Sequence, residues 1–227
     1  MPSAQIRLLS VAAAATMLTA GCSSSSSSPG GQSSSPSTGT TTTSPATSQA
    51  ADVRAILTAQ LTDHVWLAGN ALDTAVLKGG NLNDPAVKGA VAALDANSVA
   101  LSKTVGSVYP AAEKPFLTSW RQHIGYFVNY TLGKATHNNA MVTKANNDLN
   151  GYRTAFGQLI NSVIPQLPAA AVAKELIPHV ATLEAAIDAA VAGSPDYQTK
   201  LSMAADHMSM TASVLTTGIV ANKKITN

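Results

Sequence analysis

Apolar residues recur at steps of three and four through most of this chain, and this spacing limits its possible folds more than any other feature. The pattern begins near Val53 and continues to about Ala221. Such steps gather side chains on one face of an α-helix, whereas a half-buried strand needs strict alternation. We find no alternating stretch flanked by hairpin turns. The sequence therefore predicts an all-α fold.

Glycine, proline and capping residues divide this region into six expected helices. Gly79-Gly80 and Gly193 are typical stops, and Asp84-Pro85 and Ser194-Pro195 are typical starts. Because the connections are short, consecutive helices should run antiparallel, as an up-and-down helical bundle built from repeated helical hairpins. The first and fifth helices also align with each other at their histidines, His64 and His179. The expected helices cover residues 53–78, 85–108, 112–134, 139–164, 169–192 and 194–221.

Residues 1–21 have the features of a lipoprotein signal peptide. Arg7 precedes an apolar stretch, Leu8 to Leu18, that is too short to remain in a bilayer as a spanning helix. The run Leu18-Thr19-Ala20-Gly21-Cys22 then resembles the lipobox of bacterial lipoproteins. In that family the cysteine thiol receives diacylglycerol and the preceding signal is removed. The resemblance implies a lipid on Cys22 and an extracytoplasmic location on the cell membrane; an ordinary secretory signal is the alternative.

The chain after the signal divides into a tether and one domain. Residues 22–50 are almost entirely Ser, Thr, Pro and Gly, which predicts a disordered tether that spans roughly 30 Å as a flexible coil. Residues 51–227 suit one domain. With 14 Lys and Arg against 12 Asp and Glu in the whole chain, no basic stripe is visible, and this argues against nucleic acid as a partner. The expected partners are the membrane, through Cys22, and an envelope protein.

Histidines occupy matching places in four of the expected helices. Each lies near the middle of its helix and on its apolar face, so that antiparallel packing brings all four to one level. A neutral imidazole is a common ligand of transition metals, and the cores of helical bundles are known places for such sites. The sequence therefore predicts a metal site whose ligands are His64, His123, His179 and His207.

Neighbouring residues suggest which metal this site prefers. Met203 and Met210 share a helical face with His207, and thioether sulfur together with imidazole favours copper, above all Cu(I), with zinc second. Glu175 precedes His179 by one helical turn, so its carboxylate is a candidate ligand or a hydrogen-bond partner of a ligand.

Two other interpretations of the histidines remain open. Duplication copies a packing histidine as readily as a ligand, in which case the domain is a structural or interaction module with no bound ligand. In the other interpretation, the domain is an enzyme or small-molecule carrier that uses a cavity between helices. No phosphate-binding loop, His-Glu-x-x-His or Gly-x-Ser-x-Gly motif occurs, so the sequence assigns no catalytic residue.

Two of the histidine segments share a short motif. Asp63-His64-Val65 and Asp206-His207-Met208 each combine an acidic residue, histidine and an apolar residue. In this respect the domain resembles a group of small exported bacterial proteins of unassigned function. Gln122-His123 and Pro178-His179 depart from the motif, so an acidic neighbour is not obligatory. The resemblance implies a helical fold and an extracytoplasmic setting, and it implies no activity.

Overall fold

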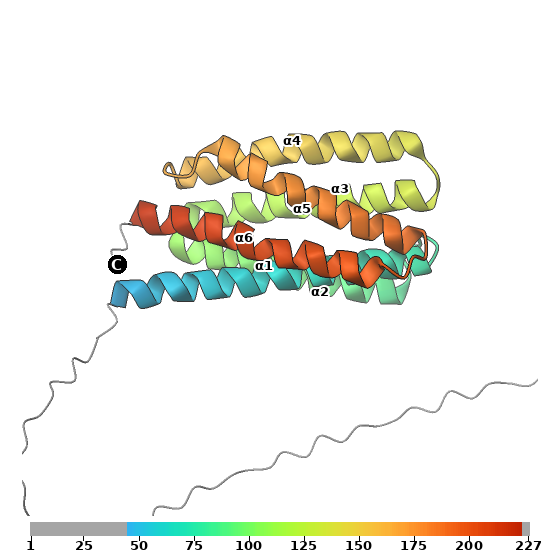
Figure 1. The fold of residues 1–227 in the computed structure, drawn as a ribbon, viewed down its shortest axis with the longest axis horizontal. Helices are drawn as coiled ribbons and strands as arrows, with labels where there is room; N and C mark the ends of the chain where they lie inside the picture. Colours follow the sequence, from blue (N-terminus) through green and yellow to red (C-terminus); the bar gives the residue numbers. More distant parts are fainter. Residues whose placement is uncertain (1–44, 224–227) are drawn as a thin grey trace, which may run out of the picture. The chain divides into compact units, whose positions relative to one another are not determined.

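The computed structural model describes residues 45–223, and every regular element in that range is a helix (Figure 1). The predicted all-α class and the six-helix up-and-down bundle are confirmed. The predictions for the signal, for Cys22 and for most of the tether concern residues outside the described range. The elements are α1 (Pro45–Leu77), α2 (Pro85–Val108), the short 3-10 helix η1 (Pro110–Ala112), α3 (Glu113–Ala135), α4 (Asn139–Val163), α5 (Ala169–Val191) and α6 (Tyr197–Lys223).

Local capping explains where most of these helices begin and end. Asp84 accepts a hydrogen bond from the Ala86 main-chain N–H at 2.8 Å, which caps the start of α2. Past the end of α1, Gly79 and Gly80 adopt φ values of 62° and 79°, which favour glycine.

Two helix starts differ from the prediction. The first helix begins at Pro45 instead of near Val53. The sixth begins at Tyr197 instead of Ser194, because the Ser194 N–H donates to Ala189 O at 2.8 Å and so belongs to the end of α5.

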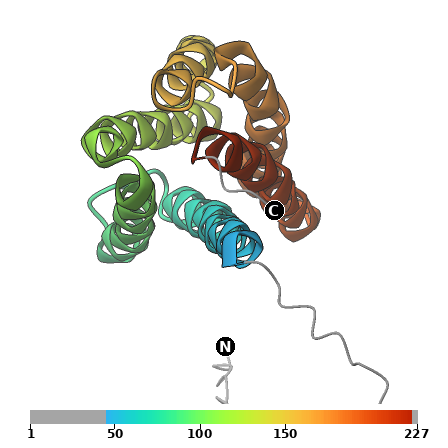
Figure 2. The same ribbon diagram turned by 90° about the vertical axis from the view of Figure 1, so that its left-hand side faces the viewer.

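The helices form a closed ring when the bundle is seen end-on (Figure 2). Each helix packs against the next in the chain, and α6 returns to pack against α1. In addition, α1, α3 and α5 contact one another across the interior. Inward-facing residues at the middle of these three helices therefore meet at the centre of the bundle. The start of α1 and the end of α6 lie at the same end of the bundle (Figure 1).

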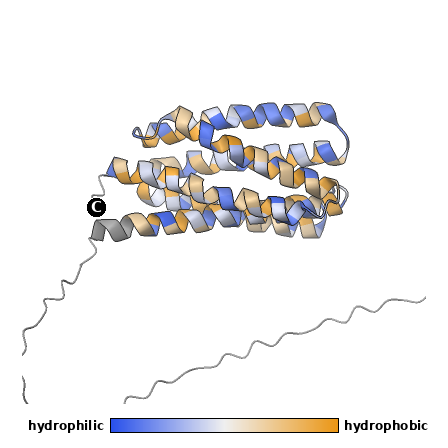
Figure 3. Cartoon of the chain, in the orientation of Figure 1, coloured by the Kyte–Doolittle hydropathy of each residue, from blue (hydrophilic) through white to orange (hydrophobic). Residues whose placement is uncertain are grey.

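The core is apolar and closely packed. Hydrophilic residues gather on the outer side of helices such as α4, while apolar residues face the interior (Figure 3). Leu61, Leu101, Leu149 and Phe156 are each at most 2% exposed. α4 and α5 approach so closely that a Cβ added at Gly157 would lie 2.3 Å from Ala169 O. This close approach sets the position of α5 in the ring.

No helix within residues 45–223 has the length and apolar character needed to cross a bilayer.

Candidate functional site

Three of the four predicted histidines meet at the centre of the bundle. His64, His123 and His179 come from α1, α3 and α5, the helices that contact one another across the interior, and they are 2%, 3% and 5% exposed. The ring centroids of His64 and His123 are 5.5 Å apart, and those of His123 and His179 are 6.5 Å apart. These spacings are close to the roughly 5 Å expected for two imidazoles on one tetrahedral metal ion.

The fourth histidine, His207 of α6, lies at the edge of this group. Its ring is 6% exposed, and its Nε2 is 3.3 Å from both Glu175 Oε1 and the Glu175 main-chain oxygen. With Nε2–H donating to Glu175, a neutral His207 ring carries its lone pair on Nδ1. Glu175 of α5 is thus the hydrogen-bond partner of His207 on the neighbouring helix α6. From its spacing, the sequence instead suggested that Glu175 acts together with His179 on its own helix.

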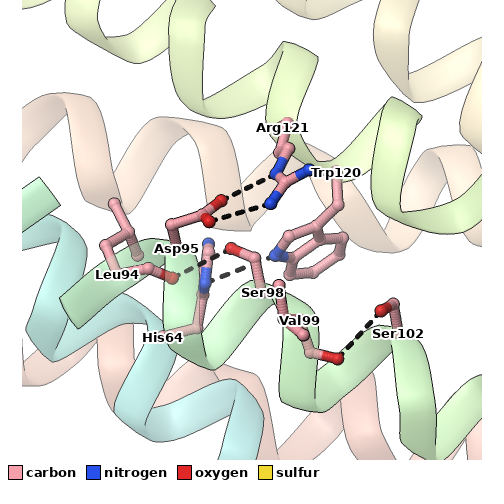
Figure 4. A network of polar contacts seen from close by, with 8 residues as sticks. All are labelled: His64, Leu94, Asp95, Ser98, Val99, Ser102, Trp120 and Arg121. Carbon is pink, nitrogen blue, oxygen red and sulfur yellow. Dashed lines mark hydrogen bonds and ion pairs between the residues drawn. The ribbon is translucent and has the colours of Figure 1, made fainter. Parts of the chain in front are cut away.

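Hydrogen bonds on α1 and α2 determine the tautomer of His64. Its Nδ1 is 3.1 Å from Asn97 Oδ1. Trp120 Nε1 approaches the same nitrogen at 3.3 Å, and Figure 4 shows this second contact. One nitrogen cannot both donate to Asn97 and accept from Trp120. The amide of Asn97 also donates to Gln60 O at 3.0 Å, which turns Oδ1 toward His64 and makes Nδ1 the donor. The lone pair of the neutral ring then lies on Nε2.

A bidentate ion pair holds α2 against α3 beside this contact. Arg121 Nε and Nη2 donate to the two carboxylate oxygens of Asp95 at 2.7 and 2.8 Å (Figure 4). The hydrogen bond from Arg121 lowers the pKa of Asp95. Both side chains are nearly half exposed, so the pair adds little stability by itself. The ion pair lies beside Trp120 (Figure 4), whose ring centroid is 4.9 Å from that of His64.

The other two central rings have an unusual deficit of hydrogen bonds. His123 Nδ1 and His179 Nδ1 are buried, and no group in residues 45–223 forms a hydrogen bond with either atom. Desolvation lowers the pKa of His123, and a hydrogen bond with the Trp120 main chain opposes this lowering only in part. A buried polar atom without a partner costs about 1–3 kcal/mol, so two in adjacent rings require a physical explanation.

Burial keeps the three central rings neutral. Desolvation lowers the pKa of His64 to about 4, opposed by the hydrogen bond to Asn97, and lowers the pKa of His179 to about 3. Desolvation, together with the nearby His64 and His179, holds the pKa of His123 well below its usual range. At neutral pH each ring therefore carries one unprotonated nitrogen, which is the form that binds metal.

A small cavity adjoins the two unsatisfied rings. Its volume is about 30 Å³, which is enough for a water molecule or a metal ion. His123, His179, Glu175 and the buried Met208 line it, together with Tyr152. The Tyr152 ring stacks on His123 with centroids 4.9 Å apart, and its buried hydroxyl is a third atom without a partner in the described helices. The three side chains that carry these atoms thus line one cavity, whose wall is formed almost entirely by apolar atoms.

A second cavity of about 60 Å³ also has His123 in its wall. It is lined by His64, His123 and mostly apolar residues, most of them from α1, α2 and α3. His123 therefore lines both cavities, the first together with His179 and the second together with His64. Within residues 45–223, no three or more His, Cys, Asp or Glu side chains are arranged to hold a metal ion.

The predicted inward orientation of two methionines is wrong. Met203 and Met210 are 58% and 54% exposed, whereas Met208 is 2% exposed and lines the first cavity. The buried face of α6 runs through Leu201, Ala205, Met208 and Ala212, with His207 at its border. Met203 and Met210 lie on the outer side of that border.

Sequence reasoning gave no role in the histidine site to two residues that shape it, Asn97 and Tyr152. Asn97 follows the buried Leu94 by three residues and so faces α1, but its pairing with His64 depends on how two helices are aligned. Tyr152 follows Leu149 in the same way on α4. Periodicity places both residues on inner faces, but the unsatisfied tyrosine hydroxyl and the cavity appear only in three dimensions.

Comparison with known proteins adds no relative: no family model, no curated protein and no solved structure matches this chain.

Proposed function

We propose that this chain is a membrane-anchored, extracytoplasmic lipoprotein without enzymatic activity, whose helical bundle binds a transition-metal ion. The ion is Cu(I) in preference to zinc, and it binds in the cavity between His123, His179 and Met208. One observation carries the proposal. The buried imidazoles of His123 and His179 are neighbours, their Nδ1 atoms have no side-chain hydrogen-bond partner among the described residues, and both rings line a cavity of about 30 Å³. Storage, buffering or delivery of copper follows from such a site.

The state of the rings supports metal binding. Burial lowers the pKa of His123 and His179, so both rings stay unprotonated at neutral pH. A metal ion accepts the lone pair of an unprotonated imidazole nitrogen, and the bond removes the cost of burying that nitrogen without a partner. Small movements of the rings into the cavity are sufficient, because their centroids are already 6.5 Å apart.

The donor set favours copper. Met208 contributes a buried thioether to the cavity, and soft sulfur ligands select Cu(I). A structural zinc site ordinarily needs four ligands, almost always Cys, His or carboxylate. Two histidines and a methionine fit Cu(I), which is stable with few ligands, and they agree with the absence of a larger His, Cys, Asp or Glu group among residues 45–223. His64, His207 and Glu175 then surround the site as partners.

Titration of purified full-length C22S protein with Cu(I) and with Zn(II) tests the metal site. We expect one Cu(I) per chain, bound more tightly than about micromolar, and a higher midpoint of thermal unfolding with metal. M208L keeps the core volume and should weaken Cu(I) more than Zn(II). H137N, in the exposed loop after α3, is the matched control. A wild-type protein that binds neither metal in the micromolar range contradicts the proposal.

Fractionation of cells that express the native chain tests the anchor separately. We expect the wild-type protein in the membrane fraction and the C22S variant in the soluble extracytoplasmic fraction, because two acyl chains on one cysteine give stable anchoring. Equal partition of the two proteins would rule out the lipid on Cys22.

A further inference from the structure

We propose that an apolar cavity at one end of the bundle binds a small neutral apolar molecule of about the size of a benzene ring. This terminal cavity lies at the end where α1 begins and α6 ends (Figure 1), and no histidine lines it. The inference goes beyond the proposed function and needs no metal.

The terminal cavity has a volume of about 110 Å³ and lies among five helices. The first half of α1, the last turns of α2 and α4, the first turn of α3 and the last third of α6 contribute to its wall. The wall is almost entirely apolar, with Ile56, Val108, Phe116, Ile164 and Ile219 among its residues. Closely packed protein interiors contain few voids larger than a water molecule, so an apolar space of this size is typical of a binding site.

The hydroxyl groups of Ser107 and Tyr109 in this wall already have partners. The Ser107 hydroxyl donates to Thr104 O at 2.8 Å, and the Tyr109 hydroxyl donates to Asn222 Oδ1 at 2.9 Å. Asn222 in turn donates to Gln166 Oε1 at 2.7 Å, which joins the end of α6 to the connection between α4 and α5. Because both hydroxyls are engaged, they offer little to a polar molecule, and the cavity suits an apolar one.

Apolar side chains connect the terminal cavity to the surface. Ile56 is 48% exposed, and Val53, Val108 and Leu215 are only half-buried, although all four line the cavity. Single exposed apolar residues are common, but a group of them around a cavity is typical of a ligand site. A ligand that enters here fills the cavity and also covers these side chains.

The volume of the terminal cavity limits the size of its ligand. An engineered cavity of about 150 Å³ lined by Leu, Ile and Phe stays dry and binds benzene. The terminal cavity is smaller, but it opens to the surface, and it shares Leu57 and Phe116 with the neighbouring cavity of about 30 Å³. A single apolar ring therefore matches it, whereas a drug-sized molecule needs about 300 Å³ or more. No charged residue lines the cavity, so the ligand is neutral.

Titration of metal-free, full-length C22S protein with benzene, followed by carbon–proton NMR of the methyl groups, tests this site. Pyrimidine is the matched polar ligand, because it has nearly the same shape as benzene and is uncharged at neutral pH. The V108F variant is designed to fill the terminal cavity with a ring of its own. V99F is the matched control, because Val99 is half-buried on the same helix and does not line the terminal cavity.

We expect saturable shifts with a dissociation constant on the order of millimolar, confined to wall residues such as Ile56, Leu215 and Ile219. Pyrimidine should bind about tenfold more weakly, because burial would cost its nitrogens their hydrogen bonds to water. V108F should abolish the shifts caused by benzene, and V99F should retain them.

Three results would overturn the proposal. The first is the absence of saturable shifts up to the solubility limit of benzene, and the second is binding by V108F with wild-type affinity. The third is a set of shifts centred on the second cavity, at Val87 and Leu183, instead of on the terminal cavity. If V108F lacks the helical circular dichroism of the wild type, the positions of the shifted methyl groups in the wild-type protein decide alone.

Discussion

The three central imidazoles, His64, His123 and His179, are individually costly to bury. Each ring has exchanged water for apolar neighbours, and only His64 has a hydrogen bond to a side chain that fixes its tautomer. Burial disfavours the charged form of a histidine. The consequence is a dependence of stability on pH that is independent of whether a metal binds.

Acidification should destabilise the fold. Between the unfolded pKa of 6.5 and the folded values of about 4 for His64 and about 3 for His179, the unfolded chain binds more protons than the folded one. Stability is therefore fully present above pH 6.5 and is lost as the pH falls, by up to about 1.4 kcal/mol per pH unit for each ring. Urea unfolding of metal-free protein at about pH 7.5 and about pH 5 measures this loss.

The control for this experiment is H137N, because His137 lies at the surface with a φ of 55°, which asparagine tolerates. The H137N variant should lose as much stability on acidification as the wild-type protein. An unfolding midpoint that stays constant from neutral pH to about pH 5 would show that the buried rings do not control the response.

At the scale of helices, α4 and α5 depend on a glycine. A Cβ at Gly157 would meet Ala169 O at 2.3 Å and Ala169 C at 3.1 Å, and both are main-chain atoms that cannot rotate away. We expect G157A to reduce the free energy of unfolding by about 1–3 kcal/mol, because α5 must move outward. Chemical denaturation measures the effect.

Gly151, on the same helix, offers a matched comparison. A Cβ there has no neighbour within 4 Å, so G151A should raise stability by up to about 1 kcal/mol through helix propensity alone. If the two variants had similar stability, the close approach of the helices at Gly157 would not contribute to the packing of α5.

The helices themselves could be predicted because their signals are local. Asp84 before Pro85 and the glycines after Leu77 act within a few residues, and the structure confirms these boundaries. Local signals could not predict whether a residue at the border of an apolar helical stripe is buried or exposed. His207 lies at the border of the α6 buried face, with Met203 on its exposed side and Met208 on its buried side, and only the packing of α6 decides which of these two sides faces inward.

At the scale of the whole molecule, the convergence of the histidines depends on which helices meet. Placement at mid-helix on an apolar face allowed all four histidines to converge, but only the structure shows that the His64, His123 and His179 rings lie close together. The position of His207 outside this group follows from contacts among α1, α3 and α5, which no local pattern contains. The cavity between the rings likewise depends on packing between distant segments.

The described helices should fold without the first 44 residues. All buried apolar residues of the described chain fall between Leu57 and Ile219, and residues 45–223 belong to one compact unit. We expect a chain of residues 45–227 to show helical circular dichroism and a single cooperative unfolding transition, with a stability within about 0.5 kcal/mol of the C22S full-length protein. A non-cooperative transition or loss of helicity would contradict this.

The start of α1 and the end of α6 lie at the same end of an antiparallel ring, and this has a practical consequence. A short linker can join Lys223 to Pro45, and the chain can be reopened at Gly79-Gly80, where the turn lies at the opposite end. Such a circular permutant keeps every helix contact while moving both termini away from the former attachment point, so that a reporter can be fused beside α2 without disturbing the histidines.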